Sequence, residues 1–136
     1  MTFYDEVGGQ ETFEKIVDAF YAQVPDDDIL GPMYPEQDMA GARDRLLWFL
    51  AQYWGGPQTF SETRGHPRLR MRHAHFPIDR NAAIRWLELM KNALDTVPET
   101  TLDAAHRAAM WEHMERVAAM LINRAEQLHR TSEQQI

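Results

Sequence analysis

Apolar side chains recur with the period of an α-helix in four stretches of the chain. The stretches cover residues 13–24, 42–54, 83–97 and 101–128, and prolines or glycine pairs separate them. Asp79 stands where the third helix needs an N-cap, because its carboxylate can accept a hydrogen bond from the first turn. No run alternates apolar and polar residues as a β-strand does. The pattern predicts an all-α fold whose four long helices, in two pairs, suit either a four-helix bundle or a small globin-like sandwich.

Two segments between these helices lack a sustained period. Residues 29–38 contain two prolines and are expected to form a turn-rich connection. Residues 55–77 contain three glycines and three prolines, and the pattern allows one short helix near residues 69–74. A loop of this length inside a compact domain is more often functional than a simple connection.

Composition narrows the class of protein. A chain of 136 residues with 44% hydrophobic side chains is expected to form one folded domain and is too apolar for disorder. It has no cysteine, which excludes disulfide scaffolds, iron–sulfur clusters and thiolate-bound haem. A metal would need His, carboxylate, Tyr or Met ligands. No apolar run approaches the ~20 residues of a membrane span, and the acidic first fifteen residues lack a secretory signal, so a cytoplasmic protein is expected.

Charge is unevenly distributed along the chain. Residues 1–42 contain ten acids and one lysine, whereas residues 43–80 contain seven arginines and three acids. The whole chain has a net charge of -7, which makes general nucleic-acid binding a poor expectation because such binding requires many basic contacts on one face. The basic middle of the chain better suits a small anionic group.

The basic segment at residues 64–76 contains four arginines and three histidines. A solvated basic loop is one interpretation. The other is that one histidine binds a metal while arginines pair with carboxylates or phosphates of a cofactor. A chelate by His73 and His75 together is disfavoured because no strand is expected there. Tyr21, Tyr34 and Trp86 also suit core packing, and spacing alone does not raise them above it.

Five motifs run through most of the chain. They are Phe3-Tyr4-Asp5-x-Val7-Gly8-Gly9, Phe20-Tyr21-Ala22-Gln23-Val24, Tyr34-Pro35-Glu36-x-Asp38, Gln52-Tyr53-Trp54-Gly55-Gly56-Pro57 and Arg64-Gly65-His66-Pro67-x-Leu69-Arg70-Met71-Arg72-His73-Ala74-x-Phe76. In this order they resemble a group II truncated haemoglobin of the kind found in actinobacteria. The resemblance implies a two-over-two helical sandwich that binds haem b over residues 1–125, followed by a helix end and polar tail at residues 126–136.

The resemblance also implies roles for individual residues. His73 would be the proximal iron ligand, with its second ring nitrogen donating to a nearby carbonyl. The distal side would be lined by Tyr21, Tyr34 and Trp86, with Ala42 and Leu46 on the next helix. The candidate partners of the haem propionates are Arg64, His66, Arg68, Arg70, Arg72 and Tyr53, and the expected apolar walls are Leu69, Phe60, Phe76, Met90 and Leu94. No role is implied for His75, His106, His113 or His129, which are expected to be solvated.

Three functions remain open on these grounds. The first is a haem protein that binds dioxygen, CO or NO. The second is an enzyme of the same fold that oxidises nitric oxide or reduces peroxide; Tyr21, Tyr34 and Trp86 would be its preorganised donors, and it would need a separate reductase. The third is a haem-free all-α regulatory domain. Association into a homodimer or higher homo-oligomer is left open.

Overall fold

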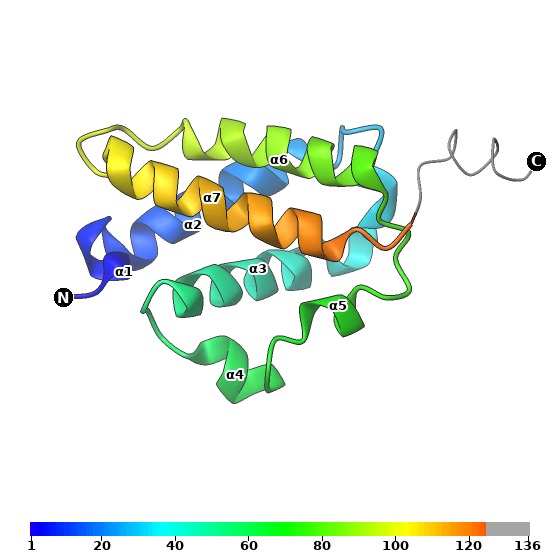
Figure 1. The fold of residues 1–136 in the computed structure, drawn as a ribbon, viewed down its shortest axis with the longest axis horizontal. Helices are drawn as coiled ribbons and strands as arrows, with labels where there is room; N and C mark the ends of the chain where they lie inside the picture. The colour runs from blue at the N-terminus through cyan, green and yellow to red at the C-terminus, as the bar shows by residue number, and fades with distance from the viewer. Residues whose placement is uncertain (125–136) are drawn as a thin grey trace, which may run out of the picture.

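The computed structural model describes residues 1–124 and contains helices but no strand in that range. Figure 1 shows their arrangement. The elements in chain order are α1 (Phe3–Glu6), α2 (Gly9–Gln23), the 3-10 turns η1 (Gly31–Met33) and η2 (Glu36–Asp38), α3 (Met39–Tyr53), α4 (Thr59–Arg64), α5 (Leu69–Arg72), α6 (Arg80–Leu94) and α7 (Ala104–Leu121). The all-α prediction is therefore confirmed. The expected tail, residues 126–136, lies outside the described residues.

The four predicted long helices are α2, α3, α6 and α7. The Asp79 side chain accepts from the Ala82 backbone N–H at 2.8 Å and caps α6 as expected. Helix α7 begins at Ala104, three residues later than the predicted start near Thr101, because Asp103 provides its N-cap. It ends at Leu121, where the backbone of Ile122 becomes extended, and Leu128 of the predicted stripe lies outside the described residues.

The short elements differ more from the prediction. The 29–38 connection is turn-rich as expected and contains η1 and η2, and the short helix expected near residues 69–74 is α5. Helices α1 and α4 were not predicted. Each has fewer than two turns, which is too short for an apolar period to show. Helix α1 forms because Thr2 and Asp5 make a capping box, in which each side chain accepts from the backbone of the other.

The long helices form a two-over-two sandwich, with α2 and α3 as one pair and α6 and α7 as the other. Helix α2 packs against both α3 and α6, while α6 also packs against α7. Phe13, Ile16 and Phe20 of α2 are fully buried, as is Met90 of α6. Each such side chain contributes about 1.5–3 kcal/mol by its burial. Helices α3 and α7 do not close the ring as they would in a four-helix bundle, because a cavity lies between them.

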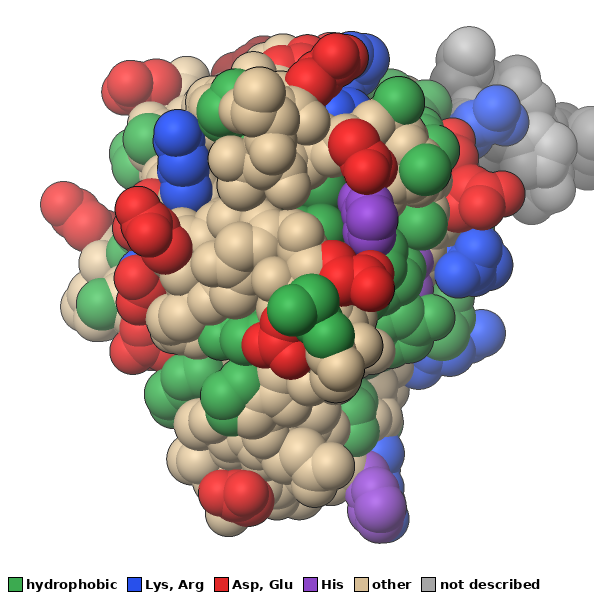
Figure 2. Space-filling model, turned by 90° about the vertical axis from the view of Figure 1, so that its left-hand side faces the viewer, with side chains coloured by type: hydrophobic (Ala, Val, Ile, Leu, Met, Phe, Trp, Pro, Cys, Tyr) green, Lys and Arg blue, Asp and Glu red, His purple; other side chains and the backbone are tan. Residues whose placement is uncertain are grey.

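Charge is separated in space as it is along the sequence. The acidic first third of the chain forms α1, α2 and the turns before α3, and acidic side chains predominate among the charged ones at the end of the molecule that carries the N-terminus (Figure 2). The basic segment forms α5 and its flanks, below α3 in Figure 1. Within residues 1–124, no helix combines the length and the apolarity needed to cross a membrane.

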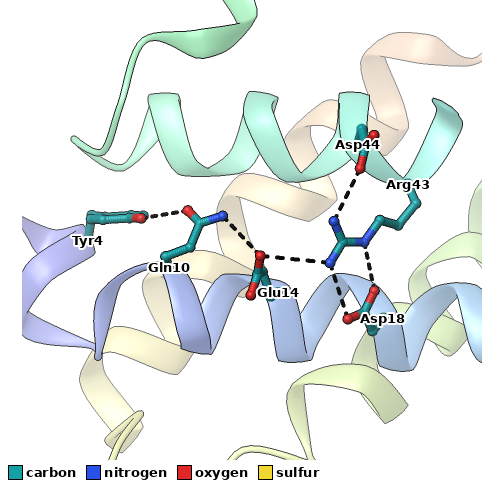
Figure 3. A network of polar contacts seen from close by, with 6 residues as sticks. All are labelled: Tyr4, Gln10, Glu14, Asp18, Arg43 and Asp44. Atoms are coloured by element: carbon teal, nitrogen blue, oxygen red, sulfur yellow. Dashed lines mark hydrogen bonds and ion pairs between the residues drawn. The ribbon is translucent and has the colours of Figure 1, made fainter. Parts of the chain in front are cut away.

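A surface network fixes α3 against α2 (Figure 3). At its centre, Arg43 of α3 binds Asp18 of α2 at 2.7 Å and Asp44 at 3.2 Å. These carboxylates raise the pKa of Arg43, so its charge is secure at any physiological pH. Such exposed pairs contribute less than about 1 kcal/mol each, so the network orients α3 more than it stabilises the fold. Its members are Tyr4, Gln10, Glu14, Asp18, Arg43 and Asp44.

Candidate functional site

A cavity of about 600 Å³ lies between α3, α5, α6 and α7, a volume within the range of pockets that enclose a whole small molecule or cofactor. Eleven of the residues for which the resemblance implies a role line it. They are Tyr21, Tyr34, Ala42, Leu46, Phe60, Arg64, Leu69, Arg72, His73, Phe76 and Trp86. Residues from five different elements and the loops between them therefore converge on one space. The resemblance predicted this convergence, whereas the helical period of the apolar residues does not predict it.

Several other expected residues are not at the cavity. The Tyr53 ring is 50% exposed and His66 is exposed, and neither lines the cavity. Of the expected apolar walls, Phe60 lines the cavity, whereas Met90 and Leu94 belong to the core further along α6. The period of α6 places those two on its buried face but does not say which neighbour that face meets.

A polar group at one side of the cavity consists of two phenols and an indole. The rings of Tyr21 and Tyr34 meet edge to face with their centroids 5.6 Å apart. The Tyr21 hydroxyl donates to the Ala42 carbonyl at 3.2 Å. Burial raises the pKa of both phenols, so both stay protonated, while hydrogen bonding with Tyr21 and Trp86 opposes the rise at Tyr34. The Trp86 indole can only donate, so Tyr34 accepts from it, and the Tyr34 hydroxyl proton has no backbone acceptor among the described residues and can turn to a cavity ligand.

His73 follows the last residue of α5 and also lines the cavity. Its Nδ1 lies 2.7 Å from the Leu69 carbonyl oxygen. A carbonyl can only accept, so Nδ1 carries the proton and Nε2 is left with a free lone pair. A neutral imidazole held in this tautomer by a backbone carbonyl is the arrangement by which proteins present histidine to a metal.

Arginines surround the cavity near α4 and α5. Arg72 is committed to the loop, because its guanidinium donates to the carbonyl oxygens of Pro67 at 2.6 Å and Arg64 at 2.7 Å. The Arg64 side chain has no hydrogen-bond or ion-pair partner among residues 1–124. Burial and the neighbouring Arg72 charge lower its pKa. A guanidinium that lines a cavity beside like charge suits an anionic ligand group.

Two further cavity residues were missed. Arg45, paired with Asp38 at 2.6 Å, lines the cavity from α3. It lies three residues after Ala42, on the same face of α3, so the helical period could have identified it. His113 was expected to be solvated, yet its ring is only 4% exposed and its Nδ1 is buried without a partner among the described residues. Its ring stacks on Tyr53 with centroids 3.5 Å apart.

Of the other histidines expected to be solvated, only His106 departs from that expectation among the described residues. His75 is exposed but contributes to the cavity wall. His106 bridges Glu6 and Asp103, with nitrogen–oxygen distances of 3.0 and 2.7 Å. His129 lies outside the described residues.

Comparison with known proteins identifies the family. The model of the bacterial-like globin family matches residues 2–123. The chain belongs to this family. It is 36% identical over 127 residues to "Group 2 truncated hemoglobin YjbI" of Bacillus subtilis, and the match covers 93% of each chain. The globin family implies a haem cofactor and the binding of small diatomic ligands.

Solved structures support the same assignment. A thermostable haemoglobin from the actinobacterium Thermobifida fusca superimposes with a TM-score of 0.83 at 46% identity, covering 90% of this chain and 98% of that one. The group II truncated haemoglobin of Bacillus anthracis gives a TM-score of 0.85 at 32% identity, with coverages of 93% and 95%. The truncated globin fold is thus confirmed by relatives with experimental structures.

The residues of this globin fit a haem. The cavity offers one imidazole with a free Nε2 for the iron and an Arg64 guanidinium for an anionic group. Between these groups its wall is made of apolar side chains, including Leu46, Phe60 and Phe76, as a porphyrin ring requires. The chemistry of the lining therefore agrees with the cofactor that the family implies.

Proposed function

We propose that this globin holds haem b in the cavity with His73 as the iron ligand and binds a diatomic gas, dioxygen first and CO or NO as alternatives. The observation that carries the proposal is the 2.7 Å contact between His73 Nδ1 and the Leu69 carbonyl, which fixes the tautomer and frees Nε2. When bound, the haem supplies an iron centre with reversible affinity for such gases. A cytoplasmic location belongs to the same proposal.

The distal group retains the gas. Tyr34 accepts a hydrogen bond from the Trp86 indole, and its own hydroxyl proton, which has no backbone acceptor among the described residues, can turn to a ligand in the cavity. A hydrogen bond in such a partly dry site contributes about 1–3 kcal/mol, enough to slow dissociation of a polar gas tenfold or more. Ala42 also lines the cavity, and its small side chain leaves space for a ligand beside these donors.

Arg64 holds the haem propionates. Its guanidinium lines the cavity with no other partner among the described residues, and Arg45 lies close enough that its charge also lowers the pKa of Arg64. Arg72 acts differently, because its hydrogen bonds to backbone carbonyls shape the loop before α5. Four of the sequence candidates have no part in this proposal because none of them lines the cavity; they are Tyr53, His66, Arg68 and Arg70.

An enzymatic function is the second candidate. The same buried donors would stabilise negative charge that develops on a reacting ligand, as oxidation of nitric oxide or reduction of peroxide requires. Either reaction needs an electron donor, which we expect to be a separate reductase. Rapid mixing of the oxygenated protein with nitric oxide tests this candidate: fast conversion to ferric haem supports it, and slow or absent conversion contradicts it.

The experiment that tests the haem proposal compares His73→Gly with His75→Gly. Both histidines line the cavity, but only His73 has the fixed tautomer. We expect His73→Gly to lose the absorption spectrum of histidine-ligated haem while its helical circular dichroism stays intact. Added imidazole should restore that spectrum. His75→Gly should match the wild type. Normal haem ligation in His73→Gly contradicts the proposed role of His73 and favours a different ligand, whereas a wild type that binds no haem favours a haem-free regulatory domain.

A further inference from the structure

One side chain ties the segment after α5 to the end of α7. The Asn123 Nδ2 donates to the His73 carbonyl at 3.1 Å and to the Phe76 carbonyl at 3.0 Å. Its Oδ1 accepts from the Ile78 backbone N–H at 2.9 Å. The Asn123 backbone N–H also donates to the Ile78 carbonyl at 2.8 Å. All three partners of this side chain are cavity-lining residues, although they lie 45 to 50 positions away in the chain.

Few other contacts hold the His73 backbone. Its N–H donates to Leu69 at 3.1 Å and its carbonyl accepts from Phe76 at 3.0 Å, and both of these bonds are local. Helix α5 has four residues, and its main packing partner among the long helices is α7. Within residues 1–124, the bond from Asn123 is the only hydrogen bond that joins the His73 backbone to another element. This bond therefore fixes the backbone that carries the imidazole relative to the end of α7.

We call the three side-chain hydrogen bonds of Asn123 the latch. Their chemistry requires an asparagine. Two carbonyls and one N–H face the side chain, and an amide offers two donors and one acceptor in that arrangement. Aspartate would turn a carboxylate toward the carbonyl oxygens of His73 and Phe76 and could donate to neither. Alanine would remove all three bonds without adding repulsion. Glutamine carries one more methylene and would not reach the same three atoms together.

We propose that Asn123 is a positioning residue, which sets the placement of the His73 imidazole by holding the backbone from His73 to Ile78. The inference rests on the proposed function, in which His73 binds the iron. Partners of this kind that orient a metal ligand typically change metal affinity by about 10- to 100-fold when they are removed. The latch also explains why a short helix with so few contacts can present a ligand in one orientation.

The test compares Asn123→Asp and Asn123→Ala with the wild type and with Asn92→Ala. Asn92 is an exposed residue of α6 whose amide donates to Gln23 at 3.0 Å, so its removal costs one hydrogen bond away from the cavity. Two properties of the haem-loaded protein are measured: the iron–histidine stretching band of the ferrous protein by resonance Raman, and the rate of haem transfer to a scavenging apoglobin. Urea unfolding of each variant gives its global stability.

We expect Asn123→Asp to shift or broaden the iron–histidine band and to speed haem transfer about tenfold, with Asn123→Ala smaller in the same direction. Asn92→Ala should leave both properties unchanged. If stability falls while the band and the transfer rate stay at their wild-type values, Asn123 is merely structural and the proposal is overturned. If Asn123→Asp does not fold, Asn123→Ala decides by the same criteria. Absence of the band in the wild type would instead contradict the role of His73.

Discussion

At the scale of single residues, the structure ranks the distal groups. The hydroxyl proton of Tyr21 is directed to the Ala42 carbonyl, whereas the hydroxyl proton of Tyr34 has no backbone acceptor among the described residues. Tyr34 is therefore the phenol whose hydroxyl proton is available to a ligand in the cavity. This distinction was not accessible from the sequence, because both residues are tyrosines on or near an apolar stripe and only their spatial partners differ.

Tyr34→Phe is expected to speed dissociation of bound dioxygen about tenfold or more, because it removes the hydroxyl that carries the free proton. Tyr21→Phe should have a smaller effect in the same direction, since its loss weakens only the support of Tyr34. Stopped-flow dissociation measurements compare the two, with Tyr53→Phe as a control outside the cavity. A larger effect of Tyr21→Phe than of Tyr34→Phe would reverse the ranking.

His113 makes stability depend on pH. Burial, aided by the charge of Arg116, lowers the pKa of its imidazole to about 4. The unfolded chain binds that proton near pH 6.5, so the unfolded state gains protons first as the pH falls and stability is lost between about pH 6.5 and 4. Allowing for water that reaches the cavity, we expect the wild type to lose about 1–2 kcal/mol between pH 7 and pH 5 from this group.

The measurement is chemical unfolding of wild type and His113→Gln at both pH values. Glutamine has no proton to gain in this range, so the variant should lose less stability on acidification, whatever its stability at pH 7. Equal losses in the two proteins would show that His113 does not titrate with a lowered pKa.

At the scale of elements, length decides what the sequence can predict. Four helices of fifteen or more residues were found from their apolar period, and Asp79 correctly marked the start of α6. Helices α1 and α4 escaped because they are too short for a period and depend on contacts distant in sequence. Helix α1, for instance, is held by a bond from the Tyr4 N–H to the Trp54 carbonyl at 2.9 Å. Hydrogen bonds between distant segments leave no local pattern.

His106 fastens α1 to the start of α7 through its bonds to Glu6 and Asp103. These carboxylates raise the pKa of the imidazole. A raised pKa means that the folded state binds the proton more tightly, so the stabilisation is complete below about pH 6.5 and is lost as the pH rises through the higher folded value. The gain is at most about 1 kcal/mol, as is usual for partly exposed ion pairs.

We therefore expect His106→Gln to be more destabilising at pH 6 than at pH 8.5. Thermal unfolding at the two pH values measures this, with His66→Gln as a control, since that exposed histidine has no ion pair among the described residues. A penalty for His106→Gln that is the same at both pH values would exclude the protonated bridge. The dependence runs opposite to that of His113, so the two histidines are distinguishable in one set of scans.

At the scale of the whole molecule, the protein consists of a close-packed part and a loosely held part. Helices α2, α3, α6 and α7 share the apolar core, whereas the short helix α4 packs on α3, the short helix α5 packs on α7, and the cavity lies beside α5. The sequence indicated this division only as a long aperiodic stretch at residues 55–77. It could not indicate the cavity, because a cavity depends on where helices distant in sequence fail to meet.

This division predicts where haem stabilises the protein. Haem that binds only the folded state adds a free energy of RT ln(1 + [L]/Kd), about 4 kcal/mol at a thousandfold excess over Kd. The added contacts fall on cavity residues such as Leu69 and His73, which lie outside the buried apolar core. Removal of haem should therefore release residues 59–78 first, while the buried face of α2 around Phe20 stays protected.

Hydrogen–deuterium exchange measured by mass spectrometry on haem-loaded and haem-free protein tests this. We expect exchange of the backbone amides in residues 59–78 to rise at least about tenfold without haem, and amides of α2 and α6 to change little. His73→Gly should resemble the haem-free wild type under both conditions, since it lacks the proposed iron ligand. If protection instead falls equally in α2 and in residues 59–78, the cavity is an integral part of one cooperative core and the proposed two-part organisation is wrong.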